Sequence, residues 1–105
     1  MKESDWKIFG KLKGKAIERF CELALEESQE VISDTETHIH NRFLLLNKLL
    51  NNRDKQLALM FDGHSRSKAW LQLLVIRSEG LADEDLLAQL SPEFRDETDP
   101  KKRGM

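Results

Sequence analysis

Apolar residues recur every three or four positions along most of this chain, which is the spacing of an α-helix that buries one face. The longest such stretch, residues 36–61, contains neither Gly nor Pro. Arg53 interrupts its apolar series at one position. The other members of the series are Ile39, Phe43, Leu46, Leu50, Leu57 and Met60. We therefore predict one long helix over 36–61, around which the remaining elements pack.

A second periodic stretch, residues 16–32, predicts a shorter amphipathic helix before the long one. Between the two, Asp34 and its neighbours compete with helix formation by bonding the backbone locally, and Ser33 with Glu36 fits a capping box. The apolar series also falls one residue out of step here. We expect a helical hairpin that turns near Asp34. A single bent helix is the alternative, because no Gly marks the turn.

The first 15 residues combine several lysines with apolar residues at helical spacing, among them Trp6 and Phe9. A helix that lies on a membrane surface has this pattern. However, Gly10 and Gly14 each cost a helix interior about 1 kcal/mol relative to Ala. We therefore favour a basic, loosely ordered arm over 1–15 that docks its aromatic residues on the body.

Gly63 and Gly80 mark two helix ends, because Gly readily adopts the left-handed conformation that closes a helix. Between them, residues 65–79 predict a third helix, which Ser65 or Ser67 can cap. Nearly every face of this helix is apolar, so we expect it to be buried on more than one side.

Two short elements follow the second glycine. Asp83 fits the cap of a fourth helix over 83–90. Ser91 and Pro92 then fit the cap and first position of a final turn that anchors Phe94.

Length and composition indicate one helical domain. The chain has 105 residues, of which 39% are hydrophobic, so its core is small unless a second chain contributes. We predict an all-α fold, a small bundle of three main helices plus a short fourth helix and the final turn, over residues 16–97. The basic arm at 1–15 precedes it, and a disordered tail at 98–105 follows it.

The formal net charge of −2 excludes the overall basic balance of a general nucleic-acid binder. The charges lie in blocks: residues 21–37 carry six acidic and no basic side chains, and residues 38–78 carry seven basic and two acidic ones. Residues 79–99 carry eight acidic and one basic. We expect the hairpin to lay acidic against basic residues, and the C-terminal acids to cover the same basic surface. Because exposed pairs contribute only about 0–1 kcal/mol each, they would set orientation more than stability.

Arg42 and Arg53 lie within the apolar stripe of the long helix. A buried guanidinium needs a carboxylate partner. If the hairpin turns near Asp34, Glu27 lies opposite Arg42, so we predict this ion pair. No acidic residue of the first helix lies opposite Arg53, which leaves solvent, the C-terminal acids or another subunit as its partner.

Histidines and carboxylates gather near the predicted turn. Asp34 and His38 are spaced to supply two metal ligands, and so are Glu36 and His40. Two ligands are too few, so we predict no metal site. Cys21, the single cysteine, lies on the apolar seam of the first helix, where we expect a buried structural thiol in a reducing compartment.

The strongest chemical hint is a basic, hydroxyl-rich segment at the start of the third helix. Free backbone N–H groups, hydroxyls and cations together suit a phosphate or an acidic peptide. The candidate anion site comprises His64, Ser65, Arg66, Ser67 and Lys68. We favour a structural role, in which the serines cap the helix while Arg66 and Lys68 face solvent or the C-terminal acids. A DNA-reading helix after Gly80 is disfavoured because it would be acidic.

No apolar run has signal-peptide character or approaches the roughly 18 residues that span a bilayer, so we expect a cytoplasmic protein. Nothing forms a catalytic or cofactor signature. We expect a non-catalytic interaction or assembly module, without cofactor, that acts as a homo-oligomer. The alternative is a small regulator that binds nucleic acid or a phosphorylated ligand through the basic start of the third helix.

The length of the helix predicted over 36–61 is the reason for expecting an oligomer. Its 26 residues span about 39 Å, which exceeds the roughly 30 Å diameter of a compact domain of this size. One neighbouring helix cannot cover its wide apolar stripe, so we favour a dimer over a monomeric bundle. The candidate interface comprises Phe43, Leu46, Leu49, Leu50, Arg53, Leu57 and Met60.

Overall fold

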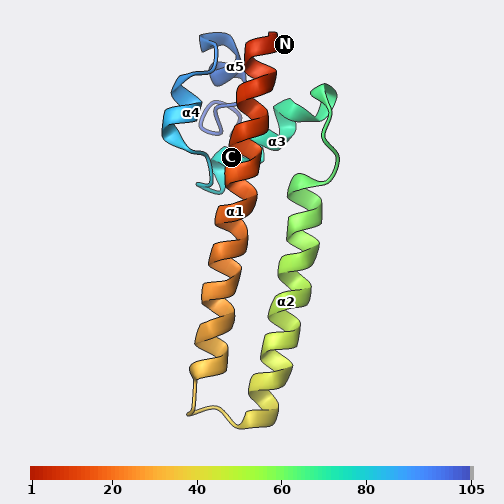
Figure 1. Ribbon diagram of the computed structural model, residues 1–105, viewed down its shortest axis with the longest axis vertical. Helices are drawn as coiled ribbons and strands as arrows, with labels where there is room; N and C mark the ends of the chain where they lie inside the picture. Colours follow the sequence, from red (N-terminus) through yellow and green to blue (C-terminus); the bar gives the residue numbers. More distant parts are fainter. Residues whose placement is uncertain (105) are drawn as a thin grey trace.

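A computed structural model describes residues 1–104 and shows an all-α fold, which confirms the predicted fold class (Figure 1). The described residues form five helices and no strand. These are α1 (Glu3–Ser33), α2 (Ile39–Phe61), α3 (Arg66–Ser78), α4 (Glu84–Ala88) and α5 (Pro92–Glu97).

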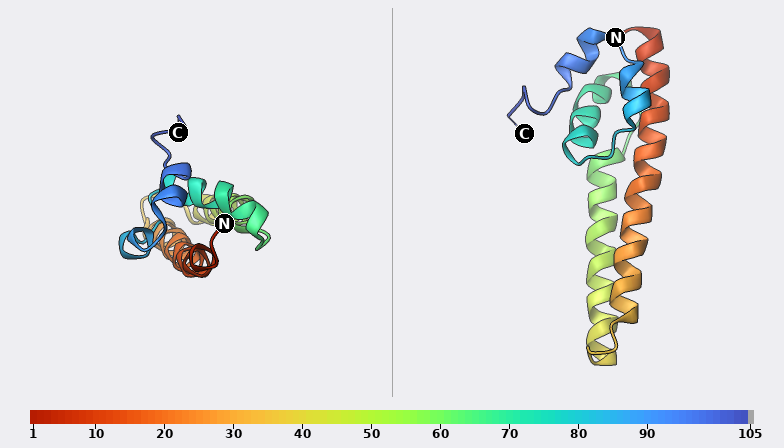
Figure 2. Two further views of the ribbon diagram at one scale, coloured as in Figure 1. Left: turned by 90° about the horizontal axis from the view of Figure 1, so that it is seen from above. Right: turned by 90° about the vertical axis from the view of Figure 1, so that its left-hand side faces the viewer.

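The molecule is elongated, with extents of 53 × 25 × 23 Å and a radius of gyration of 16.6 Å. A compact domain of this length would have a radius near 13 Å. Helices α1 and α2 run side by side, and α3, α4 and α5 gather around the N-terminal half of α1 (Figures 1 and 2). We call residues 17–60, the two-helix extension, the arm. The rest is the head.

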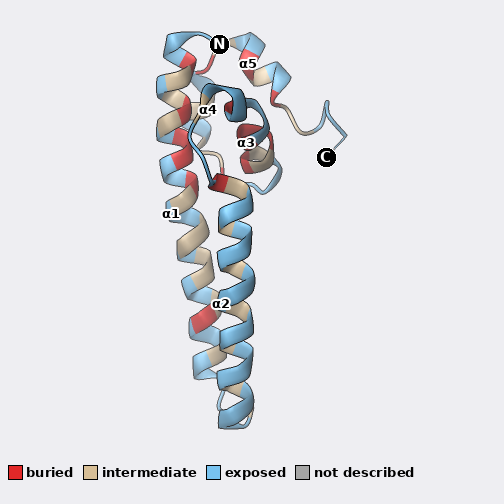
Figure 3. Cartoon of the chain, turned by 90° about the vertical axis from the view of Figure 1, so that its right-hand side faces the viewer, coloured by how far each residue is buried: buried red, intermediate tan, exposed pale blue. Residues whose placement is uncertain are grey.

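Almost all of the buried residues lie in the head (Figure 3). The core cluster comprises Phe9, Leu12, Ala16, Phe61, Ala69, Leu73, Ile76, Leu81, Leu90 and Phe94. Within the arm, which the structure describes throughout, Ser28 is the one residue classed as buried, and its hydroxyl donates to the carbonyl of Ala24 at 2.7 Å. The arm therefore has no closed apolar core of its own.

The prediction that the basic N-terminal residues 1–15 are loosely ordered is wrong, because α1 begins at Glu3 and continues for 31 residues. Phe9 and Leu12 are fully buried in the head core. Burying each such side chain contributes roughly 1.5–3 kcal/mol, which outweighs about 1 kcal/mol for each glycine. Gly10 and Gly14 face away from the core, and a Cβ atom at either position would meet no other part of the fold within 4 Å.

Two buried polar side chains of α1 attach the head to this helix. The Asp5 carboxylate accepts hydrogen bonds from the backbone N–H of Ser91 at 2.8 Å and from its hydroxyl at 2.6 Å. Lys13 donates to the carbonyl of Gly63 at 2.7 Å, and Gln72 donates to the same carbonyl at 3.0 Å. Burial is the main cause that lowers the pKa of Lys13.

The predicted helix ends of the head are confirmed. Gly63 and Gly80 have φ values of 77° and 71°, in the left-handed region. After α3, the backbone N–H of Leu81 donates to the carbonyl of Ile76 at 3.0 Å, and that of Gly80 donates to Arg77 at 3.1 Å. This is the Schellman arrangement, which satisfies the last carbonyls of a helix.

The caps of the two short helices also agree with the prediction. The Asp83 carboxylate accepts from the N–H of Leu86 at 2.9 Å, and the Ser91 hydroxyl accepts from that of Phe94 at 3.3 Å. Pro92 occupies the first turn of α5. Phe94 is buried, as expected for the anchor of this segment.

The third helix is buried less completely than predicted. Ala69, Leu73 and Ile76 are fully buried, but Trp70 and Leu71 remain 40% and 55% exposed. The head therefore covers one broad side of α3 and leaves its opposite side open.

The predicted disordered tail at 98–105 is wrong at its first residue, because Thr98 is fully buried. Its hydroxyl donates to the carbonyl of Phe94 at 2.7 Å and accepts from Arg77 at 3.0 Å. Further along, Arg103 donates to the carbonyl of Glu97 at 3.0 Å. Residue 105 lies outside the described residues.

Because Leu12 is fully buried, we expect Leu12→Ala to lower the free energy of unfolding by about 2–5 kcal/mol. Leu59→Ala is the matched control, since this side chain is 87% exposed and should change stability by less than about 0.5 kcal/mol. Urea unfolding followed by tryptophan fluorescence measures both. Equal, small effects would mean that the N-terminal half of α1 is not part of the core.

Candidate interaction surface

The arm is a true hairpin, with α1 and α2 separated by a loop at residues 34–38. The Asp34 carboxylate accepts from the Thr37 hydroxyl at 2.6 Å and from the N–H of Glu36 at 3.1 Å, which closes the turn. Both bonds help to lower the pKa of Asp34, the one from the Thr37 hydroxyl most. The predicted Ser33–Glu36 capping box is wrong, because His38 caps α2 through its ring nitrogen.

The predicted Glu27–Arg42 ion pair is also wrong. Glu27 pairs with Arg53 through two hydrogen bonds of 2.6 and 3.2 Å, whereas Arg42 donates to the carbonyl of Ile32 at 2.8 Å. The loop carries the chain past the end of α1 before α2 begins (Figure 1). Each residue of α1 therefore meets a later residue of α2 than a tight turn at Asp34 would give.

The Glu27–Arg53 contact is the main polar link between the helices of the arm. The hydrogen bonds from Arg53 lower the pKa of the Glu27 carboxyl below its ordinary 4.5, and the carboxylate raises the pKa of the guanidinium. The pair lines a surface hollow of about 410 Å³ together with Phe20, Leu23 and Met60. Acidic and basic blocks thus meet within the hairpin, as their order along the chain predicts.

The C-terminal acidic block does not cover the basic surface of the long helix, contrary to the prediction. Its carboxylates reach two lysines of the N-terminal segment instead: Asp83 lies 3.1 Å from Lys15 of α1, and Glu93 lies 3.9 Å from Lys2, which precedes α1. The backbone N–H of Leu86 and the Lys15 ammonium lower the pKa of Asp83. Among the described residues, the C-terminal acids therefore form no ion pair with the basic side chains of α2.

Eight large apolar side chains of the arm are exposed, and four of them lie on one side of it. Leu25 and Ile32 of α1 are 68% and 56% exposed, and Phe43 and Leu50 of α2 are 67% and 46% exposed. Within each helix the two residues are seven positions apart, which is close to two full turns and places them on one side. We call these four residues the open face.

The two halves of the open face lie on the same side of the hairpin. Leu25 follows Ala24 and Leu50 follows Leu49, and both preceding residues are half-buried between the helices. One residue corresponds to about 100° of rotation. Because α1 and α2 are antiparallel, a step of one residue rotates the side-chain direction clockwise in one helix and anticlockwise in the other when both are viewed from the same end. The side chains of both helices therefore emerge on one common flank.

The head packs against the opposite flank. Leu12, which is buried in the head core, precedes Lys13, which reaches the end of α2. Gly14 follows Lys13 and has open space around it. Successive residues of α1 thus point to the head, to α2 and to the open side. Figure 2 shows α3 and α5 on one side of α1, so the head does not cover the open face.

The structure divides the predicted interface residues into two groups. Phe43 and Leu50 belong to the open face. Five others are half-buried, in the seam of the hairpin or near the head: Leu46, Leu49, Arg53, Leu57 and Met60. Leu25 and Ile32 were not among the predicted interface residues, and their signal was an apolar stripe on the first helix too wide for one neighbour. Whether any of these residues contacts a second chain stays a prediction.

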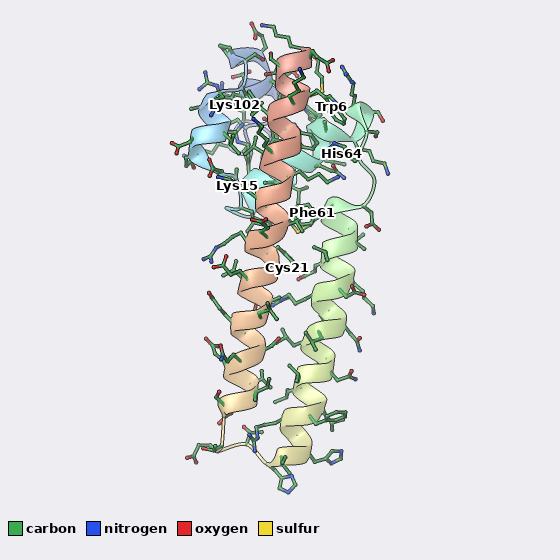
Figure 4. The ribbon with its side chains drawn as sticks, viewed as in Figure 1. Trp6, Lys15, Cys21, Phe61, His64 and Lys102 are labelled. Carbon is green, nitrogen blue, oxygen red and sulfur yellow. The ribbon has the colours of Figure 1, made fainter. Side chains whose placement is uncertain are left out.

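The residues of the candidate anion site lie together, but two of them are held by α1. The His64 ring stacks on Trp6 with ring centroids 4.5 Å apart (Figure 4). Arg66 bonds the Glu3 carboxylate at 2.6 Å and lies 5.3 Å from the centre of the Trp6 ring. The Ser65 hydroxyl makes no capping bond and lies 3.2 Å from that of Ser67. Lys68 is exposed.

Other chemistry is sparse among residues 1–104. They contain no cluster of three or more His, Cys, Asp or Glu side chains arranged to hold a metal ion. Cys21 is half-buried rather than fully buried. None of the described helices is both long and apolar enough to cross a membrane. Comparisons with protein-family models, with curated proteins and with solved structures find no match.

The Glu27–Arg53 contact predicts acid sensitivity. Because its pKa is lowered on folding, Glu27 contributes stability that is present above its ordinary pKa of 4.5 and is lost as the pH falls through the folded value. We expect Glu27→Gln to lower stability at pH 7 and to reduce the further loss between pH 5 and pH 3. Urea unfolding at these pH values measures both effects. Parallel curves for the two proteins would contradict this role.

If residues 63–68, which contain the candidate anion site, are structural, Arg66→Ala combined with Lys68→Ala should shift thermal unfolding by no more than about 5 °C, since both side chains are solvent-exposed. Inorganic phosphate should then raise the Tm of the wild type no more than chloride of equal ionic strength. A phosphate-specific rise in the wild type that disappears in the double variant would favour the anion-binding alternative.

Proposed function

We propose that this chain is a non-catalytic assembly module that pairs with a second copy of itself through the open face of the arm. The observation that carries the proposal is the row of four exposed apolar side chains on two helices, on the flank away from the head. Contiguous apolar surface of this kind is typical of interaction sites.

The exposed area of the chain is consistent with an interface of standard size. A compact monomer of 12.2 kDa would expose about 6,100 Å², whereas this chain exposes 7074 Å². The excess, about 1,000 Å², is similar to the roughly 800 Å² that each partner buries in a standard protein interface. An arm that pairs along its length would bury surface of this order.

The packing of the open face suits a second copy. Its four side chains carry no charge, and the exposed Asp54, four residues after Leu50, lies on the same side of α2. Two antiparallel hairpins stacked face to face form a four-helix bundle, in which every helix gains a second neighbour. The seven-residue spacing within each helix suits such packing.

The alternative, a regulator that binds nucleic acid or a phosphorylated ligand, has less support. Its central residues His64 and Arg66 already contact Trp6 and Glu3. The open face, by contrast, has no partner within the described chain.

We expect light scattering after size exclusion to give twice the 12.2 kDa chain mass at micromolar concentration, and Leu50→Glu to restore the single mass. A buried carboxylate at the centre of an apolar contact is strongly disfavoured. Leu50 is already 46% exposed, so the monomer should keep its helical circular dichroism.

Leu59→Glu is the matched control for this measurement. Leu59 lies nine residues further along α2, two and a half turns away, and therefore points to the opposite side. It should leave the mass unchanged. A monomeric wild type, or equal dissociation by both variants, would refute pairing through the open face.

A further inference from the structure

We infer that the Asp54 carboxylate weakens pairing through the open face at neutral pH, and that pairing strengthens in mild acid as this carboxylate takes up a proton. The inference rests on the proposed pairing and specifies how it is regulated. The partner is still a second copy of the chain, and the proton is the ligand that shifts the equilibrium.

Asp54 lies among the apolar side chains of the open face. It follows Leu50 by four residues and Phe43 by eleven, so its side chain points within about 40° of the first and about 20° of the second. Asp54 is exposed, and across residues 1–104 its carboxylate forms no ion pair. Each copy therefore brings one carboxylate into the proposed contact.

The basic neighbours of Asp54 on α2 do not neutralise it. Arg53 directs its guanidinium into the seam of the hairpin, where two hydrogen bonds join it to Glu27. Lys55 is exposed and points about 140° away from Leu50, and so away from the open face. The charge on Asp54 is thus left facing the approaching copy.

The part of α1 that packs against α2 adds further acids on the same side. Residues 17–33 carry five acidic side chains and one basic. Glu18 and Glu22 point within about 20° and 60° of Leu25, and so lie on or beside the open face. The one basic residue, Arg19, lies 3.5 Å from Glu22. The open face is therefore bordered by acids on both helices.

Two symmetric arrangements stack the open faces, and an ionised Asp54 is unfavourable in both. With the heads at the same end, α2 of one copy lies beside α1 of the other, so Asp54 faces an acidic helix. With the heads at opposite ends, α2 lies beside α2, and Asp54 loses water against the exposed apolar side chains of its partner. A nearby like charge and the loss of water both disfavour the charged form of a carboxylate.

Proton uptake on pairing follows from this difference. Asp54 is exposed in the free chain, so the paired state binds its proton more readily, and lowering the pH favours the pair. The sign is opposite to that of the Glu27–Arg53 contact, whose contribution is lost in acid. Between pH 7.5 and pH 5.0, above the ordinary pKa of 4.5 for Glu27, that contact is kept and the effect on pairing can be measured alone.

Sedimentation equilibrium at pH 7.5 and pH 5.0, at equal ionic strength, tests the inference. We expect the dimer Kd of the wild type to be at least about threefold lower at pH 5.0. Asp54→Asn, which removes the charge and keeps the shape, should lower the Kd at pH 7.5 by a similar factor and remove most of the pH dependence. Helical circular dichroism at both pH values verifies that the fold is kept.

Glu30→Gln is the matched control. This exposed carboxylate of α1 points about 140° away from Leu25, toward the flank opposite the open face, so its loss should change neither the Kd nor the pH dependence. His38 and His40, near the tip of the arm, also titrate in this pH range. A pH dependence that survives Asp54→Asn would assign the effect to other groups, such as these histidines, and overturn the inference.

The outcomes separate the two proposals. Tighter pairing of the Asp54→Asn variant at pH 7.5, with little remaining pH dependence, supports the inference. Paired protein whose Kd is indifferent to Asp54→Asn overturns the inference and leaves the assembly function standing. Wild type and variant that are both monomeric at both pH values overturn the assembly function and the inference with it.

Discussion

The continuity of α1 is the constraint on which the rest of this structure depends. One helix of 31 residues belongs to both parts of the molecule, and its burial in the head fixes the direction in which the arm extends. Leu12, Lys13 and Gly14 show how three successive positions serve three environments, namely the head core, the end of α2 and open space. Because the helix is not interrupted, the same division of sides continues into the arm. The open face lies on the side that the head leaves free.

Polar contacts in the head complement this packing. Asp5 satisfies the backbone at the start of α5, and Lys13 with Gln72 satisfies the carbonyls between α2 and α3. Buried groups of this kind are costly when unpaired, so each makes alternative docking positions unfavourable. In the arm, the partly exposed Glu27–Arg53 pair favours one register of the hairpin through its two directional hydrogen bonds. Each part of the molecule thus combines an apolar surface with a few directional bonds that select one arrangement.

Local patterns predicted much of the fold, because capping residues and glycines act over a few positions. The caps at Asp83 and Ser91 and the left-handed Gly80 required no knowledge of distant contacts. The helical, packed state of the N-terminal residues could not be predicted in this way, since Phe9 is buried by segments far along the chain. The partner of Arg53 was missed because the loop length sets which residues meet, and no local signal fixed that length. The open face was predicted only in part: the stripe on α2 was evident, but its continuation on α1 depends on how the two helices face each other.

The separation in sequence between Asp5 and Ser91, 86 residues, has a consequence for the order in which the chain folds during synthesis. The contacts within the arm join residues 17–60, all of which are synthesised before α5. The head must wait for α5, which follows α3 and α4 along the chain. During that interval, Phe9 and Leu12 have no lasting cover, and the newly made protein exposes its future core. A translational pause before α5 would therefore prolong the period in which the chain is most prone to aggregate or to bind a chaperone.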